Sequence, residues 1–192
     1  MKKQLAGMAL IALAAAPMAA NAVVYQFNAT LNGASEVPSR ITPATGVATL
    51  FYDTADNTYD FSLSVFNLTA TASAFHIHGA AMTTENGPVR VSLDAAPFVH
   101  FKAGGTLLVG GSGVAAPLSF SATPVTSSNG GHPAMSFLQM LQGGLAYVNV
   151  HTPTFPGGEV RGQLLQVAVV PEPATYALML GGLAAVGAFA RR

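Results

Sequence analysis

Hydrophobic and polar residues alternate along short segments in the middle of the chain. The clearest segment is YDFSLSVFNL (59–68), in which every second residue from Tyr59 to Val65 is apolar and the residues between them are Asp or Ser. Because successive side chains of a strand point to opposite faces, this period of two predicts a strand with one buried face. VVYQFNATL (23–31) and GVATLFYD (46–53) show the same pattern, and residues 53–57 between two such segments predict a hairpin turn.

More alternating segments follow: SAFHIHG (73–79), GPVRVSL (87–93), and AYVNVHT (146–152) joined to GEVRGQLLQV (158–167) by a turn. In 87–93 we expect Val89, Val91 and Leu93 to point inward. The Gly-, Ser- and Pro-rich stretch 102–133 predicts loops with one or two strands.

One segment has helical spacing. In PAMSFLQMLQGG, Met135, Leu138 and Leu141 recur with a helical period before a Gly-Gly stop. About eight short strands and this single helix predict an all-β fold, an antiparallel Greek-key β-sandwich or barrel.

The two ends of the chain differ from the middle. Lys2 and Lys3 precede an almost wholly apolar stretch, residues 5–16, and Ala20-Asn21-Ala22 is a small-x-small cleavage site. These three parts predict a secretory signal peptide over 1–22. At the other end, 174–190 is an uncharged, mostly apolar helix candidate of 17 residues, near the short limit for a transmembrane helix.

The C-terminal segment resembles the PEP-CTERM sorting signal of exported bacterial proteins. The matching features are Pro171-Glu172-Pro173, the apolar stretch and the final Arg191-Arg192. The resemblance implies that 169–192 is a sorting tail, recognised by the export machinery and a membrane-embedded sorting protease. The protein would then pass through an inner-membrane intermediate to the cell surface or the extracellular space. A plain single-span anchor fits the same pattern.

Composition narrows the function of the central domain, which we place at 23–168. Only 8% of the residues are charged, and the stretch 23–170 carries a formal net charge of −3, so we expect no nucleic-acid partner. The chain has no cysteine, which excludes disulfides and thiolate metal sites.

Three histidines are the main candidates for chemistry. Strand alternation places His76 and His78 on one face of their segment and His151 on the polar face of another. If the two strands are neighbours, three imidazoles converge on an outward face near Glu159 or Arg161 and suit a copper or zinc ion. His132 is a candidate fourth ligand. The alternative is a polar cluster in which the histidines bond to Glu159 and Asn149, or in which Glu159 and Arg161 brace the sheet as a charge pair.

Six stretches together resemble the CHRD domain of exported proteins. They are LNGASEVP (31–38), TPATGVA (42–48), YDFSLSVFNL (59–68), AFHIHGAA (74–81), NGPVRVSL (86–93) and AYVNVHTPTFPGGEVRGQL (146–164). The resemblance brings no established catalytic activity. The sorting signals at both ends and the absence of a complete catalytic set favour a non-enzymatic module of the cell surface or extracellular matrix. Beside the histidines, the resemblance implicates Gly79, Asn149, Gly157, Gly158, Glu159, Arg161 and Gly162.

A second similarity keeps a redox alternative open. AFHIHG and VNVHT are similar to the copper-ligand strands of Cu/Zn superoxide dismutase, with His132 as a loose match to the bridging histidine. The disulfide cysteines and the zinc-loop ligands of that family have no counterpart. The alternative function is therefore a copper- or zinc-binding protein with dismutase-like redox activity at His76, His78 and His151.

The signal-peptide interpretation predicts a defined mature N-terminus. Cleavage after Ala22 should leave Val23 as the first residue, because the small residues at 20 and 22 suit the signal peptidase. N-terminal sequencing of the exported protein measures this directly. A chain that still begins at Met1 would overturn the interpretation.

Overall fold

The computed structural model describes residues 23–114, 131–133, 135–170 and 182–183. Strands dominate the described residues, with one 3-10 turn and one short α-helix. In chain order the elements are β1 (Val24–Asn32), η1 (Gly33–Ser35), β2 (Thr45–Asp53), β3 (Thr58–Phe66), β4 (Ala74–His78), β5 (Val89–Ser92), β6 (Val99–Ala103), β7 (Thr106–Val114), α1 (Phe137–Gln142), β8 (Tyr147–His151), β9 (Val160–Gln163) and β10 (Leu165–Val170).

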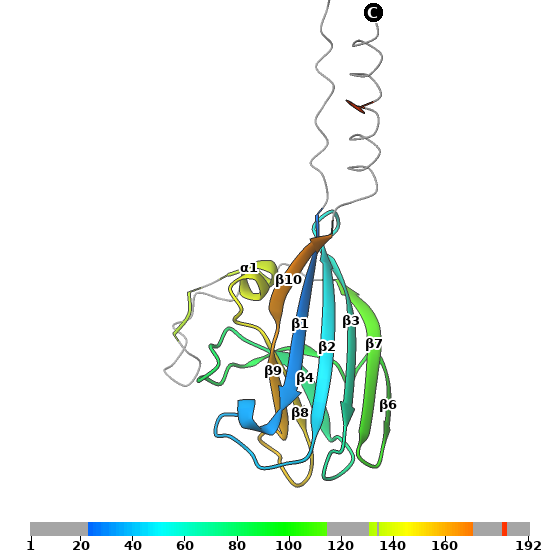
Figure 1. Ribbon diagram of the computed structural model, residues 1–192, viewed down its shortest axis with the longest axis vertical. Helices are drawn as coiled ribbons and strands as arrows, with labels where there is room; N and C mark the ends of the chain where they lie inside the picture. The colour runs from blue at the N-terminus through cyan, green and yellow to red at the C-terminus, as the bar shows by residue number, and fades with distance from the viewer. Residues whose placement is uncertain (1–22, 115–130, 134, 171–181, 184–192) are drawn as a thin grey trace, which may run out of the picture.

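The strands form one antiparallel sheet that curls into a half-barrel (Figure 1). The order across the sheet is β5-β4-β8-β9-β1-β2-β3-β7-β6, and β10 pairs with β1 beside that path. The predicted all-β antiparallel fold is confirmed. The sheet is continuous, and its curl brings β4 and β8 to face β1–β3 across the core, as the natural twist of long sheets allows.

The long strands β1, β2 and β3 make regular hairpin pairs. β2 and β3 remain in register from Thr45↔Phe66 to Asp53↔Thr58, which confirms the predicted turn between them. Asn57 has a φ of 57°, a left-handed conformation that Asn tolerates well. The Asp53 and Asp56 side chains accept bonds from nearby backbone N–H groups, so this acidic turn closes on itself.

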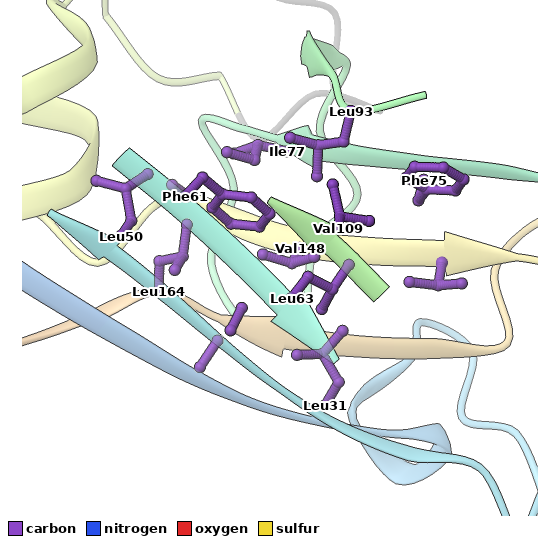
Figure 2. Close-up of a cluster of buried hydrophobic side chains, with 14 of the residues drawn as sticks. Leu31, Leu50, Phe61, Leu63, Phe75, Ile77, Leu93, Val109, Val148 and Leu164 are labelled. Carbon is purple, nitrogen blue, oxygen red and sulfur yellow. The ribbon is translucent and has the colours of Figure 1, made fainter. Parts of the chain in front are cut away.

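The core lies inside the curl. Figure 2 shows Leu31, Leu50, Phe61 and Leu63 from one half of the sheet beside Phe75, Ile77 and Val148 from the other. Phe75, Ile77, Val148 and Val150 are 0% exposed. Each such side chain stabilises the fold by about 1.5–3 kcal/mol relative to an exposed one. In β4 and β8, this burial fixes which residues point away from the core.

The prediction for 87–93 was only partly right. Leu93 is buried, but Val91 is half-buried and Val89 is 48% exposed. The register of β4 and β5 shifts between Ile77 and His78, where His78 pairs with Val89. This irregularity breaks strict alternation, so the first residue of β5 turns outward.

The helix is present, but its buried face differs from the expected one. α1 begins after Ser136, which forms a capping box with Gln139. Phe137, Met140 and Leu141 are buried, while Met135 and Leu138 are only partly buried against the core. The starting residue of a short helix sets which positions face inward. The apolar spacing alone did not identify that starting residue.

Both predicted end segments lie mainly outside the described residues. The signal peptide, 1–22, is wholly outside them, and so are Pro171, Glu172, Pro173, Arg191 and Arg192. Of the expected C-terminal helix, residues 182–183 are described, as helical. Within the described part of the chain, no helix has the length and apolar character needed to cross a bilayer.

The core analysis predicts a strong contrast within β2. Leu50 is 0% exposed and Val47 is 59% exposed. Leu50→Ala should lower the free energy of unfolding by about 2–5 kcal/mol, because it removes buried contacts and leaves a cavity. Val47→Ala is the control and should cost less than about 1 kcal/mol. Urea unfolding of both variants measures the difference, and equal losses would contradict the assigned faces of β2.

Candidate metal centre

Strand pairing brings the three histidines together. β4 and β8 are neighbours, and His76 pairs with Asn149 while Ala74 pairs with His151. Since the alternate residues of both strands face the core, the imidazoles of His76, His78 and His151 lie on the opposite face. The two histidine-bearing strands are therefore neighbours, as the prediction of a shared site required.

The three rings are close enough to share one ion. One ring nitrogen from each of His76, His78 and His151 lies within 4.8 Å of the others. Their ring centroids are 5.3–6.0 Å apart. We expected these imidazoles on an outward, solvent-facing surface. Instead, His78 is only 8% exposed, and His76 and His151 are half-buried.

Backbone carbonyls orient two of the rings. Nδ1 of His78 lies 2.9 Å from the Gly87 oxygen, and Nδ1 of His151 lies 3.0 Å from the Pro156 oxygen. A carbonyl can only accept, so each Nδ1 carries the proton and each Nε2 keeps its lone pair. Both Nε2 atoms are buried without a hydrogen-bond partner, as is Nδ1 of His76. Each ring therefore offers one unpartnered nitrogen.

The imidazoles are neutral near pH 7. Burial lowers the pKa of His78 to about 4, despite the bond to Gly87. Burial also lowers the pKa values of His76 and His151. Neutral imidazole is the form that binds metals, so the site is already in the ligating state at neutral pH.

Tyr147 and Arg161 form a wall beside His78. The Tyr147 ring stacks on His78 with centroids 5.0 Å apart at 12°, and the Arg161 guanidinium carbon lies 3.5 Å from the Tyr147 centroid. Arg161 also donates to the Glu85 and Met82 oxygens at 2.6 and 2.8 Å. These bonds hold the loop that supplies Gly87, so Arg161 acts on His78 through both the stack and the loop.

Glu159 and Arg161 do not form the expected charge pair. Glu159 is 0% exposed and accepts four bonds, from Thr42, Thr152 and both the N–H and the hydroxyl of Thr69. Burial acts to raise the pKa of Glu159, but these bonds outweigh it and hold the pKa below its ordinary value. The carboxylate thus ties three loops to the end of β9, and the guanidinium is occupied elsewhere.

The structure keeps His132 out of the cluster. Its Nε2 lies 3.0 Å from a Glu85 carboxylate oxygen, and the group of potential ligands among the described residues contains only the other three. His132 as a fourth or bridging ligand therefore stays a prediction, and its ring is bonded to Glu85 in this structure.

The implicated glycines are structural. Gly79 has a φ of 152°, and a Cβ there would lie 2.5 Å from Met140 Sδ, so the backbone needs glycine where it passes α1. Gly158 has a φ of 121°, and a Cβ there would meet the oxygens of Asn149 and Glu36 at 2.6–2.8 Å. Gly157 is exposed, and Gly162 lies within β9.

Two residues of this region were missed by sequence reasoning. Glu36 is 5% exposed and lies against Asn149, and Gly87 supplies the carbonyl that orients His78. Glu36 was visible as a rare charge inside an apolar stretch, but its partner is far away in sequence. Gly87 acts through its backbone and leaves no side-chain signal.

Comparison with known proteins identifies two segments. Neither the curated proteins nor the solved structures yield a match. The PEP-CTERM protein-sorting motif matches residues 169–192, which supports an exported protein that is sorted through its C-terminal tail. The motif implies recognition by a sorting protease in the membrane. The family model of the CHRD domain matches residues 27–164, and the chain therefore belongs to the CHRD domain family.

Proposed function

We propose that this exported protein binds a copper or zinc ion through His76, His78 and His151 at the cell surface or in the extracellular matrix. One observation carries the proposal: one ring nitrogen from each of the three histidines lies within 4.8 Å of the others, and each of these rings has a buried nitrogen without a hydrogen-bond partner. A single ion between the rings would satisfy all three lone pairs.

A hydrogen-bonded polar cluster explains the face less well. That alternative needs Glu159 or Asn149 to bond the imidazoles, but the Glu159 oxygens take bonds from threonines. The Asn149 amide nitrogen donates to Glu36 at 3.4 Å. Each unsatisfied buried polar atom costs about 1–3 kcal/mol. Three such atoms on three neighbouring rings favour a ligand that accepts their lone pairs.

The ligand chemistry favours copper or zinc. Both ions bind neutral imidazole well, while magnesium and calcium require oxygen ligands. The carbonyls of Gly87 and Pro156 accept from the far nitrogens of two rings, the usual support for a metal-bound histidine. Ligand nitrogens around a bound ion lie roughly 3–3.5 Å apart, so small ring rotations inward from 4.8 Å would complete the site.

Three protein ligands leave at least one coordination position for a small molecule or a partner side chain. We infer a binding role, in line with a non-enzymatic surface module. Dismutase-like redox activity would require copper in particular, together with access for the substrate. Superoxide turnover by the copper-loaded protein is the assay that distinguishes the two.

Removing one histidine should remove the ion. Protein purified without a histidine tag should contain about one copper or zinc ion per chain, measured by inductively coupled plasma mass spectrometry. His78→Ala should weaken metal binding by more than the 10–100-fold that loss of a supporting contact costs, because a direct ligand is gone. The fold should persist, since the side chain lies outside the apolar core.

His100→Ala is the matched control. His100 also has a buried ring nitrogen without a partner, but it lies on β6 and belongs to no ligand group in the described residues. Its removal should leave the metal content unchanged. Equal metal content in the wild type and His78→Ala, or equal loss in both variants, would contradict the proposal.

A further inference from the structure

Two glutamates are buried in this domain, in opposite surroundings. Glu159 receives four hydrogen bonds, as a carboxylate requires. Glu36 is 5% exposed, yet it receives a single side-chain bond, 3.4 Å long, from Asn149 Nδ2 to Oε2. Its other oxygen, Oε1, is buried without a partner. A buried carboxylate this poorly bonded is costly.

A second unpartnered atom and the first both lie close to Gly158. Asn149 Oδ1 is also buried without a partner. A Cβ on Gly158 would lie 2.6 Å from Asn149 Oδ1 and 2.7 Å from Glu36 Oε1, so both unpartnered oxygens lie against Gly158. Two acceptors repel unless one of them carries a proton.

Turning the Asn149 amide over does not remove the conflict. An amide has one donor end and one acceptor end, whereas an ionised carboxylate has two acceptors. In either orientation, the single donor end of the amide leaves one carboxylate oxygen without a donor. A proton on Glu36 resolves both orientations.

We propose that Glu36 is a neutral carboxylic acid in the folded protein and donates its proton to Asn149, forming a two-bond acid–amide pair that closes the η1 loop over β8. Oε1–H donates to Oδ1 while Oε2 accepts from Nδ2. The pair satisfies both unpartnered oxygens. Loss of the proton sets two acceptors against each other and favours opening of the 33–44 loop. The inference uses Glu36 and Asn149 alone and is independent of the metal proposal.

The charged and titratable neighbours do not neutralise Glu36 by contact. Arg161 on β9, Arg40 in the loop after η1 and Tyr147 on β8 face it. Among the described residues, the ion pair within 4.0 Å is His132–Glu85, so neither arginine makes a salt bridge with Glu36. Burial raises the pKa of Glu36 to about 7 against the attraction of Arg161 and Arg40 and against hydrogen bonds from Asn149 and the Val37 backbone.

The sign of the resulting pH dependence follows from proton binding. Between the ordinary pKa of 4.5 and the folded value of about 7, the folded chain keeps a proton that the unfolded chain releases. The stabilisation from Glu36 is therefore complete below pH 4.5 and is lost as the pH rises to about 7. The histidines have lowered pKa values and act in the opposite direction, so a variant that retains them is required.

Glu36→Gln isolates the effect in the full exported chain. Gln has the donor and acceptor of the protonated acid, so the variant should match the wild type at pH 4 and be more stable at pH 8. The gain in the folding equilibrium constant should be on the order of 100-fold, measured by urea unfolding across this range. Glu159→Gln is the matched control with the opposite sign. It should be less stable at pH 8, and its deficit should shrink as the pH falls, because an ionised carboxylate is lost.

A direct measurement decides the case even if Glu36→Gln does not fold. The carboxyl carbon of Glu36 in the wild type should titrate by NMR with a midpoint near 7. A midpoint near the ordinary 4.5 would overturn the proposal. So would a Glu36→Gln variant that loses as much stability at pH 8 as at pH 4.

Discussion

The antiparallel pairing of β4 with β8 is the contact on which the candidate metal centre depends. These strands lie more than 60 residues apart in the chain, and their register sets Phe75 opposite Val150 and Ile77 opposite Val148. All four side chains are fully buried, so a slip by one residue would turn them outward. The apolar core thereby fixes the positions of the imidazoles on the other face. The convergence of the three imidazoles follows from this hydrophobic register, because no histidine has to make a stabilising contact for the strands to align.

Because the chain has few charged residues, the partners of each buried charge decide which loops are held in place. Arg161 is 1% exposed, and its donors go to backbone carbonyls rather than to a carboxylate. This choice ties the loop after β4 to β9 and leaves Glu159 free to bind the threonines of three other segments. Both side chains therefore hold loops in place where no strand or helix does so. The loops they hold supply the carbonyls that orient His78 and His151.

Sequence alternation was sufficient for the strands and for the faces of most residues. It identified the β2–β3 hairpin, the all-β class and the shared face of His76 and His78, because these depend on local period alone. It failed where a single residue shifts the alternation of buried and exposed positions. The register shift at His78 turns Val89 outward, and the cap at Ser136 moves the buried face of α1 to Phe137. The partners of Glu36 and His132 were also beyond reach, since those contacts join loops whose positions depend on the whole topology.

The state of Glu36 and the state of the histidines bear on the same small region. Asn149 pairs with His76 across the strands, and its side chain bonds Glu36. The η1 loop therefore rests on the strand that supplies one ligand and pairs with the strand that supplies two. Opening of that loop would admit water to the neighbourhood of the imidazoles and weaken the desolvation that keeps them neutral. On the two proposals, the same strand would carry one ligand of a metal ion and the contact that closes a loop whose stability depends on Glu36.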